Sequence, residues 1–376
     1  MSSSVRVLLL AVFVLPVAAC GQSPAIEVDG VQFVRQTVSV PPGQKEAVTG
    51  DLTGDGLPDL LLAVENSVLV FRGDGSGGFG HRQRFDAGPN PVGPVVAELN
   101  GDGPLDVVVA NHETTQLTLL GGTGSGALEP LPTSPLSIDV APHPHAVRAA
   151  DLDGDGYVDL VVDHREAGGV LVLRGRGDGT FLSPGMVVDA GGDPYRGMAV
   201  GDLNDDGHPD LVTPNPSAVG ILLNDGTDPL RFSQHAIDTQ AGPFAVGLGD
   251  LNADGHLDVV AALDEGSSLV RVYLGDGAGT FQEASTSPFR LTAGGKSIAQ
   301  GDFNGDGVDD AAITCWNGSE VLLLLGGTDA LRTATLPVEG NPWGPTGADW
   351  NGDGVDDLII PDAGSGRVVA YLSRVK

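Results

Sequence analysis

The chain has 376 residues, of which 57 are glycine and 26 are proline, and aromatic residues account for 5%. This composition favours many short strands joined by tight turns and argues against long helices. The formal net charge of −31 makes nucleic acid an unsuitable partner, because the protein would repel its phosphates.

The first 20 residues have the pattern of an export signal. Arg6 precedes an apolar run over residues 7–17, which is too short to span a membrane as a helix. Residues 17–21 read Val-Ala-Ala-Cys-Gly and resemble a bacterial lipobox, which implies cleavage before Cys20 and lipidation of its thiol. The alternative is an ordinary secretory signal in which the cysteine is incidental.

These features divide the chain into a lipoprotein signal peptide at 1–19, a lipidated cysteine and tether at 20–30, and a folded domain at 31–376. The lipid would hold the domain outside the cytoplasm, at the outer membrane or cell surface of a bacterium, since an acidic domain has no affinity for a membrane by charge. With Cys20 lipidated, Cys315 has no disulfide partner, and we expect it to be a small buried apolar residue.

One nine-residue pattern recurs seven times along the rest of the chain. Its clearest copy, residues 151–159, has acidic groups at positions 1, 3, 5 and 9 and glycine at position 6. The copies, here called the acidic loops, begin at Asp51, Glu98, Asp151, Asp202, Asp250, Asp302 and Asp349. Their spacing of 47 to 53 residues is typical of propellers and solenoids, so each repeat is one structural unit.

The spacing within the acidic loops suits a hard cation. Alternate positions point successive oxygens at one centre, and glycine at position 6 allows the positive φ that turns the carbonyl of position 7 inward. An EF-hand would need Glu at position 12, where these loops carry apolar residues or threonine. The alternative is a set of acidic turns that bind no ion.

Four short antiparallel strands are expected in each repeat, which makes the repeat a propeller blade. The strand after each acidic loop, such as residues 60–64 or 107–110, is unbroken in its apolar character and is therefore expected to be buried. Only two strands remain after the seventh loop. We predict that residues 31–40 supply the outer strand of the last blade and thereby close the ring.

Residues 249–259, followed by 274–281, resemble the FG-GAP/VCBS repeat, and the resemblance covers nearly all of the mature chain. It implies an all-β fold, the seven-bladed β-propeller of the integrin α-subunit head, with calcium-binding loops between the first two strands of each blade. The implied ligands of up to seven Ca²⁺ ions are the side chains at positions 1, 3, 5 and 9 and the carbonyl at position 7. In chain order these residues are Asp51, Thr53, Asp55, Leu57, Asp59, Glu98, Asn100, Asp102, Pro104, Asp106, Asp151, Asp153, Asp155, Tyr157, Asp159, Asp202, Asn204, Asp206, His208, Asp210, Asp250, Asn252, Asp254, His256, Asp258, Asp302, Asn304, Asp306, Val308, Asp310, Asp349, Asn351, Asp353, Val355 and Asp357.

Two acidic loops depart from this pattern. The first has Thr53 at position 3, and the second has Glu98 at position 1 and Pro104 at position 7. We expect both to bind Ca²⁺ more weakly than the other five.

The face opposite the acidic loops is where we expect ligand recognition, because the connections that lead into successive blades carry different residues at equivalent positions. Tyr195, Phe244 and Trp343 are candidates to stack on a sugar ring or on a partner's side chain. The alternative is that these rings pack between blades.

A group of histidines and arginines falls on the same predicted face. Its members are His112, His143, His145, His164, Arg165 and Arg196. Such a density suggests a transition-metal site or an acid/base pair, although no spacing fixes a tetrahedral zinc geometry. The alternative is a set of exposed loop histidines without a shared role.

The sequence therefore predicts a lipid-anchored, Ca²⁺-stabilised module that binds a protein or glycan ligand and is not an enzyme. No nucleophile motif, phosphate loop or dinucleotide fingerprint occurs in the sequence. The alternative is a carbohydrate-active enzyme, such as a polysaccharide lyase, that uses the histidines and arginines. The fold by itself does not choose between these functions.

Overall fold

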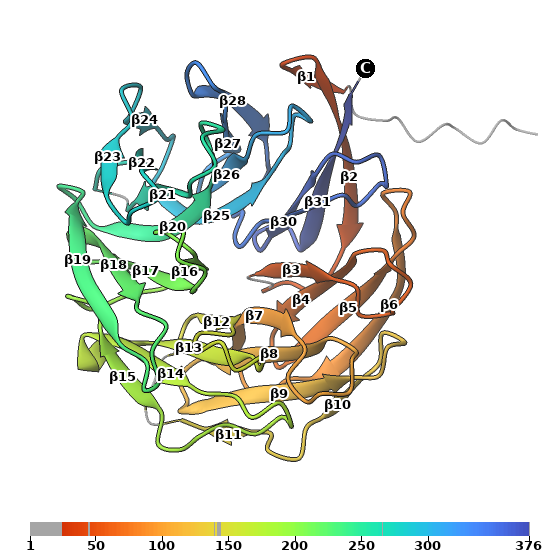
Figure 1. Cartoon of the computed structure of the whole chain (residues 1–376). Helices are drawn as coiled ribbons and strands as arrows, with labels where there is room; N and C mark the ends of the chain where they lie inside the picture. Colours follow the sequence, from red (N-terminus) through yellow and green to blue (C-terminus); the bar gives the residue numbers. More distant parts are fainter. Residues whose placement is uncertain (1–24, 44–45, 139, 141–143, 265, 376) are drawn as a thin grey trace, which may run out of the picture.

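The computed structural model describes residues 25–43, 46–138, 140, 144–264 and 266–375. Seven antiparallel sheets are arranged as blades around a central axis (Figure 1). The helical structure within these residues is a single 3-10 turn at Arg165–Ala167. The predicted all-β, seven-bladed propeller is confirmed.

Blades one to six follow the chain from the N-terminal side. Blade one contains β3 (Ala47–Gly50), β4 (Asp59–Val64), β5 (Ser67–Gly73) and β6 (Phe79–Asp86), and blade two contains β7 (Pro91–Ala97), β8 (Asp106–Asn111), β9 (Gln116–Gly122), β10 (Leu128–Pro130) and β11 (Leu136–Ser137). Blade three contains β12 (Val147–Ala150), β13 (Asp159–His164), β14 (Gly169–Leu173) and β15 (Met186–Asp189), and blade four contains β16 (Ala199–Gly201), β17 (Asp210–Asn215), β18 (Ala218–Asn224) and β19 (Phe232–Asp238). Blade five contains β20 (Pro243–Gly249), β21 (Asp258–Leu263), β22 (Leu269–Gly275), β23 (Phe281–Glu283) and β24 (Phe289–Arg290), and blade six contains β25 (Gly295–Gly301), β26 (Asp310–Cys315), β27 (Glu320–Leu325) and β28 (Arg332–Pro337).

The seventh blade joins the two ends of the chain. It contains β29 (Thr346–Ala348), β30 (Asp357–Asp362), β31 (Arg367–Val375), β2 (Val31–Ser39) and β1 (Ile26–Val28). β2 pairs with β31 along its whole length, from Val31 opposite Val375 to Ser39 opposite Arg367. The prediction that residues 31–40 complete the last blade is confirmed by this pairing.

The start of the sheet lies earlier than the sequence suggested. β1 forms a hairpin with β2 in which Val28 pairs with Val31. The two turn residues between them, Asp29 and Gly30, have φ values of +55° and +86°, as a tight hairpin with a right-handed twist requires. The predicted tether at 20–30 is therefore wrong for residues 26–30, and Asp-Gly was the overlooked turn signal.

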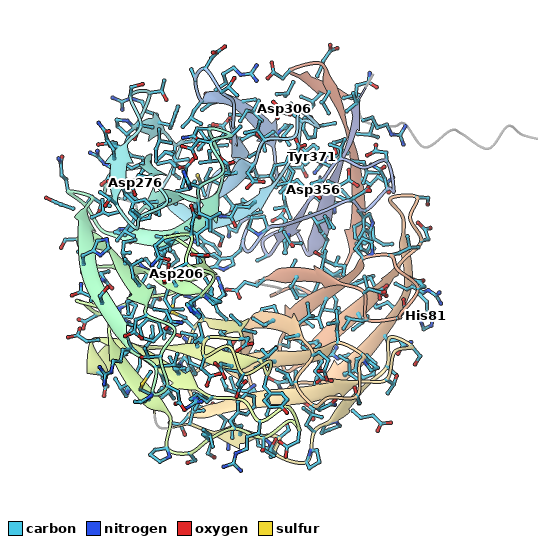
Figure 2. All side chains as sticks on the ribbon, viewed as in Figure 1. His81, Asp206, Asp276, Asp306, Asp356 and Tyr371 are labelled. Atoms are coloured by element: carbon cyan, nitrogen blue, oxygen red, sulfur yellow. The ribbon has the colours of Figure 1, made fainter. Side chains whose placement is uncertain are left out.

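Strand order within each blade places the acidic loops close to the axis. The first strands of neighbouring blades contact one another around the ring, as β3 contacts β7 and β29. The second strands are buried along their whole length, as predicted from their apolar sequences, except for His164 at the end of β13. Figure 2 shows the result: Asp206, in the fourth acidic loop, lies nearer the centre of the ring than His81 of β6, which lies at its rim.

The core consists of apolar clusters between adjacent blades. Phe303 and Tyr371 belong to the cluster between blades six and seven, and Trp350 belongs to the cluster between blades seven and one. Cys315 is a free, buried cysteine, and burial raises the pKa of its thiol. Within the described residues, no helix has the length and apolar character needed to cross a membrane.

Candidate metal centres and ligand-binding face

Each acidic loop joins the first strand of its blade to the second and is folded around its own carboxylates. In the third loop, Asp151 accepts hydrogen bonds from the amides of Asp155 (3.1 Å) and Gly156 (2.8 Å), and Asp155 accepts one from Tyr157 (2.9 Å). Gly156 has φ +87°, the left-handed conformation predicted for position 6. The side chains at positions 1 and 5 therefore shape the backbone of the loop.

The aspartate at position 9 is the most buried carboxylate of each acidic loop. Asp159 has no exposed surface, and its two carboxylate oxygens accept the amides of Leu152 (3.1 Å) and Gly175 (2.7 Å). Gly175 follows the third strand of the blade, so this carboxylate ties the loop to the sheet. Equivalent pairs of amides bind Asp106, Asp210, Asp258 and Asp310.

Burial raises the pKa of all seven position-9 carboxyls, although backbone hydrogen bonds oppose the shift. The pKa rises to about 6 for Asp159, Asp210 and Asp258 and to about 7 for Asp310 and Asp357. Neighbouring carboxylates of the same loop raise it further. A buried negative charge of this kind is stabilised by a cation held beside it.

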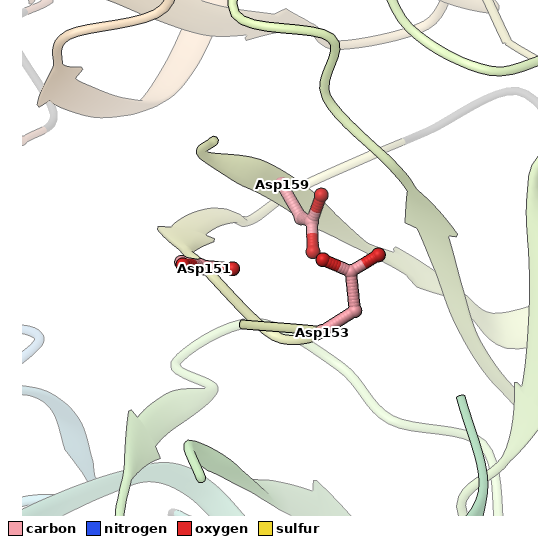
Figure 3. Close-up of side chains that lie close together, drawn as sticks. All are labelled: Asp151, Asp153 and Asp159. Carbon is pink, nitrogen blue, oxygen red and sulfur yellow. The ribbon is translucent and has the colours of Figure 1, made fainter. Parts of the chain in front are cut away.

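The side-chain geometry of the acidic loops fits a calcium ion. Oxygens of Asp151, Asp153 and Asp159 all lie within 4.8 Å of one another (Figure 3). In the seventh loop, the Oδ2 atom of Asp357 is buried without a hydrogen-bond partner. The donors are carboxylate, amide and carbonyl oxygens, which suit Ca²⁺. The calcium ligand sets remain a prediction that this geometry supports.

Two arginines lie against the acidic loops at equivalent positions. Arg72 directly precedes Gly73 and contacts Asp55 at 2.8 Å, and Arg174 directly precedes Gly175 and forms an ion pair with Asp153. A cation in the third loop would share Asp153 with this guanidinium. The sequence analysis missed both arginines, because their distance from the loops along the chain hides the contact.

The acidic loops are also locked to the next blade around the ring. The carbonyl of Leu52, at position 2 of the first loop, accepts the amide of Gly126 from blade two at 3.0 Å. The carbonyl of Leu99 accepts the amide of Gly179 from blade three at 2.9 Å in the same way. The folding of each such loop therefore supports a contact between blades, which is a structural role.

The other face of the disk carries an arc of aromatic rings. The acidic loops follow the ends of the first strands, so the residues that lead into those strands lie on the opposite face. The rings in this aromatic arc are those of His112, His145, Tyr195, Phe244, Trp343 and Trp316. Successive rings pack edge to face with centroids 4.5 to 5.9 Å apart.

Cationic side chains cover the faces of these rings. Arg165 lies 4.4 Å from the centroid of Tyr195, and Lys296 lies 3.9 Å from that of Phe244. Arg196 lies over both Tyr195 and Trp343, at 5.6 and 5.2 Å. Phe244 is itself buried. A sugar ring could stack on these aromatic faces only after displacing a cation.

The histidines on this face do not share one centre within the described residues. His145 is buried and its Nδ1 lies 3.1 Å from Asp163, which also accepts the amides of His145 and Ala146. His112 contacts the His145 ring, whereas His143 lies outside the described residues. The one group of three potential metal ligands found among the described side chains is Asp151, Asp153 and Asp159.

Two hollows adjoin the aromatic arc. The axial cavity, of about 120 Å³, is lined by residues that include Glu46, His145, Arg148, Arg196, Lys296 and Trp343. The outer hollow, of about 430 Å³, lies between blades four and five and is lined by residues that include Arg165, Asp193, Tyr195, Asn215, Phe244 and Asp264. Most of the predicted recognition residues therefore line or border these two hollows.

A model of the FG-GAP-like repeat matches residues 51–109, 98–162, 164–213, 202–261 and 250–313. The chain belongs to this FG-GAP-like repeat family. No curated protein matches it significantly.

Solved structures similar to this FG-GAP propeller share its fold at low identity. The crystal structures of BBS1N in complex with ARL6DN, soaked with lead and with mercury, are each 15% identical, with TM-scores of 0.61 and 0.63. They cover 93% and 90% of this chain and 96% of their own. A lectin from Agrocybe aegerita, described as recognising non-reducing terminal N-acetylglucosamine, is 19% identical with a TM-score of 0.55 and covers 85% of this chain and 86% of its own.

Sequence reasoning missed several residues of the recognition face of this FG-GAP propeller. Glu46 and Arg148 line the axial cavity as charged groups, and Trp316 extends the aromatic arc from the turn between β26 and β27. The signal that could have identified Glu46 and Arg148 is their common place at the start of a first strand, the strand of each blade that lies nearest the axis.

Proposed function

We propose that this protein is a lipid-anchored, Ca²⁺-stabilised propeller that binds a protein or glycan ligand outside the cytoplasm. The observation that carries the proposal is the aromatic arc, which six residues from three blades and three inter-blade connections build beside the axial cavity on one face. The acidic loops occupy the opposite face, so recognition and ion binding are separated. Its structural neighbours, one in complex with ARL6DN and one a lectin, support a binding role for such a fold.

The anchor and the ions are parts of this proposal that rest on the sequence and on the chemistry of the loops. Cys20 lies outside the described residues, and its lipidation follows from the resemblance to a lipobox. The all-oxygen donor sets and buried carboxylates of the acidic loops support Ca²⁺ as the stabilising ion.

The binding proposal is tested with the exported Cys20→Ser protein on a glycan array and by crosslinking to surface proteins of the source cell. Tyr195→Ala should abolish the signal, because it opens the aromatic arc beside both hollows. Tyr157→Ala is the matched control, since Tyr157 is an exposed tyrosine on an acidic loop. Equal binding by both variants would place the ligand elsewhere.

The second candidate function is a polysaccharide lyase. The observation that favours it is the buried His145–Asp163 pair, which orients an imidazole beside the Arg196 guanidinium of the axial cavity. The test is the release of unsaturated sugar products from acidic polysaccharides. Product formed by the unsubstituted protein and absent with His145→Gln would establish an enzyme in place of a binding module.

A further inference from the structure

The axial cavity is lined mainly by positive charges, although the protein as a whole is strongly acidic. The whole chain carries 50 acidic residues and 19 lysines and arginines. Among the described residues that line the cavity, however, Arg148, Arg196 and Lys296 supply three positive charges and Glu46 supplies the one carboxylate. The side chains of Arg196 and Lys296 are only 13% and 9% exposed. A cationic pocket in an acidic protein attracts an anion selectively.

Arg196 is held in this cavity with unused hydrogen-bond donors. Its Nε and Nη1 atoms are buried and have no hydrogen-bond partner, and Glu46 Oε1 lies 3.7 Å from Nη1, beyond hydrogen-bonding distance. Leaving buried donors unpaired costs stability, so they mark a place where an acceptor is expected to bind.

The backbone of Arg196 is also strained. Its φ of +57° lies in the left-handed region that long side chains rarely adopt. Strain of this kind persists where the surrounding structure requires one direction for a side chain, and it is common at ligand sites. Here it sets the guanidinium between the rings of Tyr195 and Trp343.

Glu46 forms an ion pair with Arg196 at 3.7 Å, which is too long to satisfy these donors by a hydrogen bond, and its carboxylate is held by other groups. It accepts a hydrogen bond from the indole N–H of Trp343 at 3.4 Å and another from the amide of Gly93. Lys296, unlike Arg196, has its charged nitrogen in a close ion pair, with Asp264. Among the described cations of this cavity, Arg196 is therefore the one whose buried nitrogen atoms lack hydrogen bonds, and Arg148 also belongs to the lining.

The volume of the cavity and the charged groups around it favour a carboxylate as the ligand. A guanidinium binds a carboxylate through two parallel hydrogen bonds. A volume of about 120 Å³ holds a carboxylate and the few atoms attached to it. Arg165 and Lys296 lie over the rings of Tyr195 and Phe244, so a sugar would have to displace a cation to stack on them, whereas a carboxylate is attracted by the same cations.

We propose that the axial cavity binds the carboxylate of an acidic side chain on a protein partner, with Arg196 as its main ligand. This inference rests on the proposed binding function of the same face and narrows it to an acidic protein surface. The aromatic arc then surrounds the inserted side chain and excludes water from the ion pair.

The experiment measures binding of the exported Cys20→Ser protein to the peptide acetyl-Gly-Gly-Glu-Gly-Gly-amide by calorimetry, in calcium and physiological salt. The same peptide with Gln in place of Glu should not bind. Arg196→Gln should weaken binding at least roughly tenfold, as expected for loss of a charged hydrogen bond. Arg196→Lys keeps the charge without the paired geometry and should be intermediate. Arg82→Gln, an exposed arginine on β6, is the control and should bind like the unsubstituted protein.

Other outcomes distinguish a failure of the carboxylate site from a failure of the proposed binding function. Binding of oligogalacturonate in place of the peptide, lost in Arg196→Gln, would show that the acidic group comes from a sugar and would overturn the protein partner. A ligand that depends on Tyr195 but not on Arg196 would overturn the carboxylate site and leave the binding function intact. Arg196→Gln should melt no lower than Arg82→Gln, because the buried donors of Arg196 have no hydrogen bonds to lose, so a loss of binding can be assigned to the site.

Discussion

Removal of calcium should lower the stability of this propeller substantially. Five acidic loops, the third to the seventh, carry the full set of oxygen donors. At ~1 mM Ca²⁺ and a dissociation constant of ~0.1 mM, each site contributes about 1.4 kcal/mol, or about 7 kcal/mol for five sites. The folded residues 26–375 unfold with an entropy of about 0.7 kcal/mol/K. Chelation should therefore lower the melting temperature by roughly 10 °C.

The raised pKa values of the buried position-9 carboxyls allow us to predict how the stability of the protein depends on pH, with and without calcium. Without metal, burial raises the folded-state pKa of Asp310 and Asp357 to about 7, above the ordinary value of 3.8. The folded protein then binds more protons than the unfolded chain between these values, so its stability falls as the pH rises from about 4 to about 7. With calcium the dependence should reverse, because protons compete with the ion for the same oxygens.

The assay is a set of melting curves at pH 5 and pH 8, in EGTA, in calcium and in magnesium. In EGTA the protein should melt at a higher temperature at pH 5 than at pH 8, and in calcium at a lower one. Magnesium should restore little stability, because it resists dehydration and prefers tighter octahedral coordination. Curves unmoved by chelation, with no calcium in elemental analysis, would refute the assignment and leave the acidic loops as turns.

Three further substitutions test other parts of the structure. Cys20→Ser should move the exported protein from the membrane to the soluble fraction on cell fractionation, whereas an unsubstituted protein that is already soluble would contradict lipidation. Arg174→Leu should raise the calcium affinity measured by titration, because the guanidinium no longer competes for Asp153. Asp258→Ala, measured in EGTA, should cost roughly 2 to 6 kcal/mol because it leaves two buried amides unpaired, whereas Asp276→Ala on an exposed turn should cost much less.

The repeat could be predicted from the sequence because its cause is local. A glycine with positive φ at position 6 and carboxylates at alternate positions shape one short loop, and seven copies at a regular spacing define seven blades. Burial of the second strands follows from their apolar residues in the same direct way. The Asp29–Gly30 hairpin was equally local, and it was missed because the turn signal was not followed to the strand before it.

The axial site could not be predicted, because it depends on contacts between blades. Glu46 and Trp343 are 297 residues apart in sequence and meet only because the seventh blade closes beside the first. Arg196 reaches them from blade four through a strained backbone conformation that no local pattern requires. The position of each ring or charge around the axis is set by how neighbouring blades pack. Closure of the ring therefore decided which of the candidate residues share one cavity, because it alone fixes the distances between them.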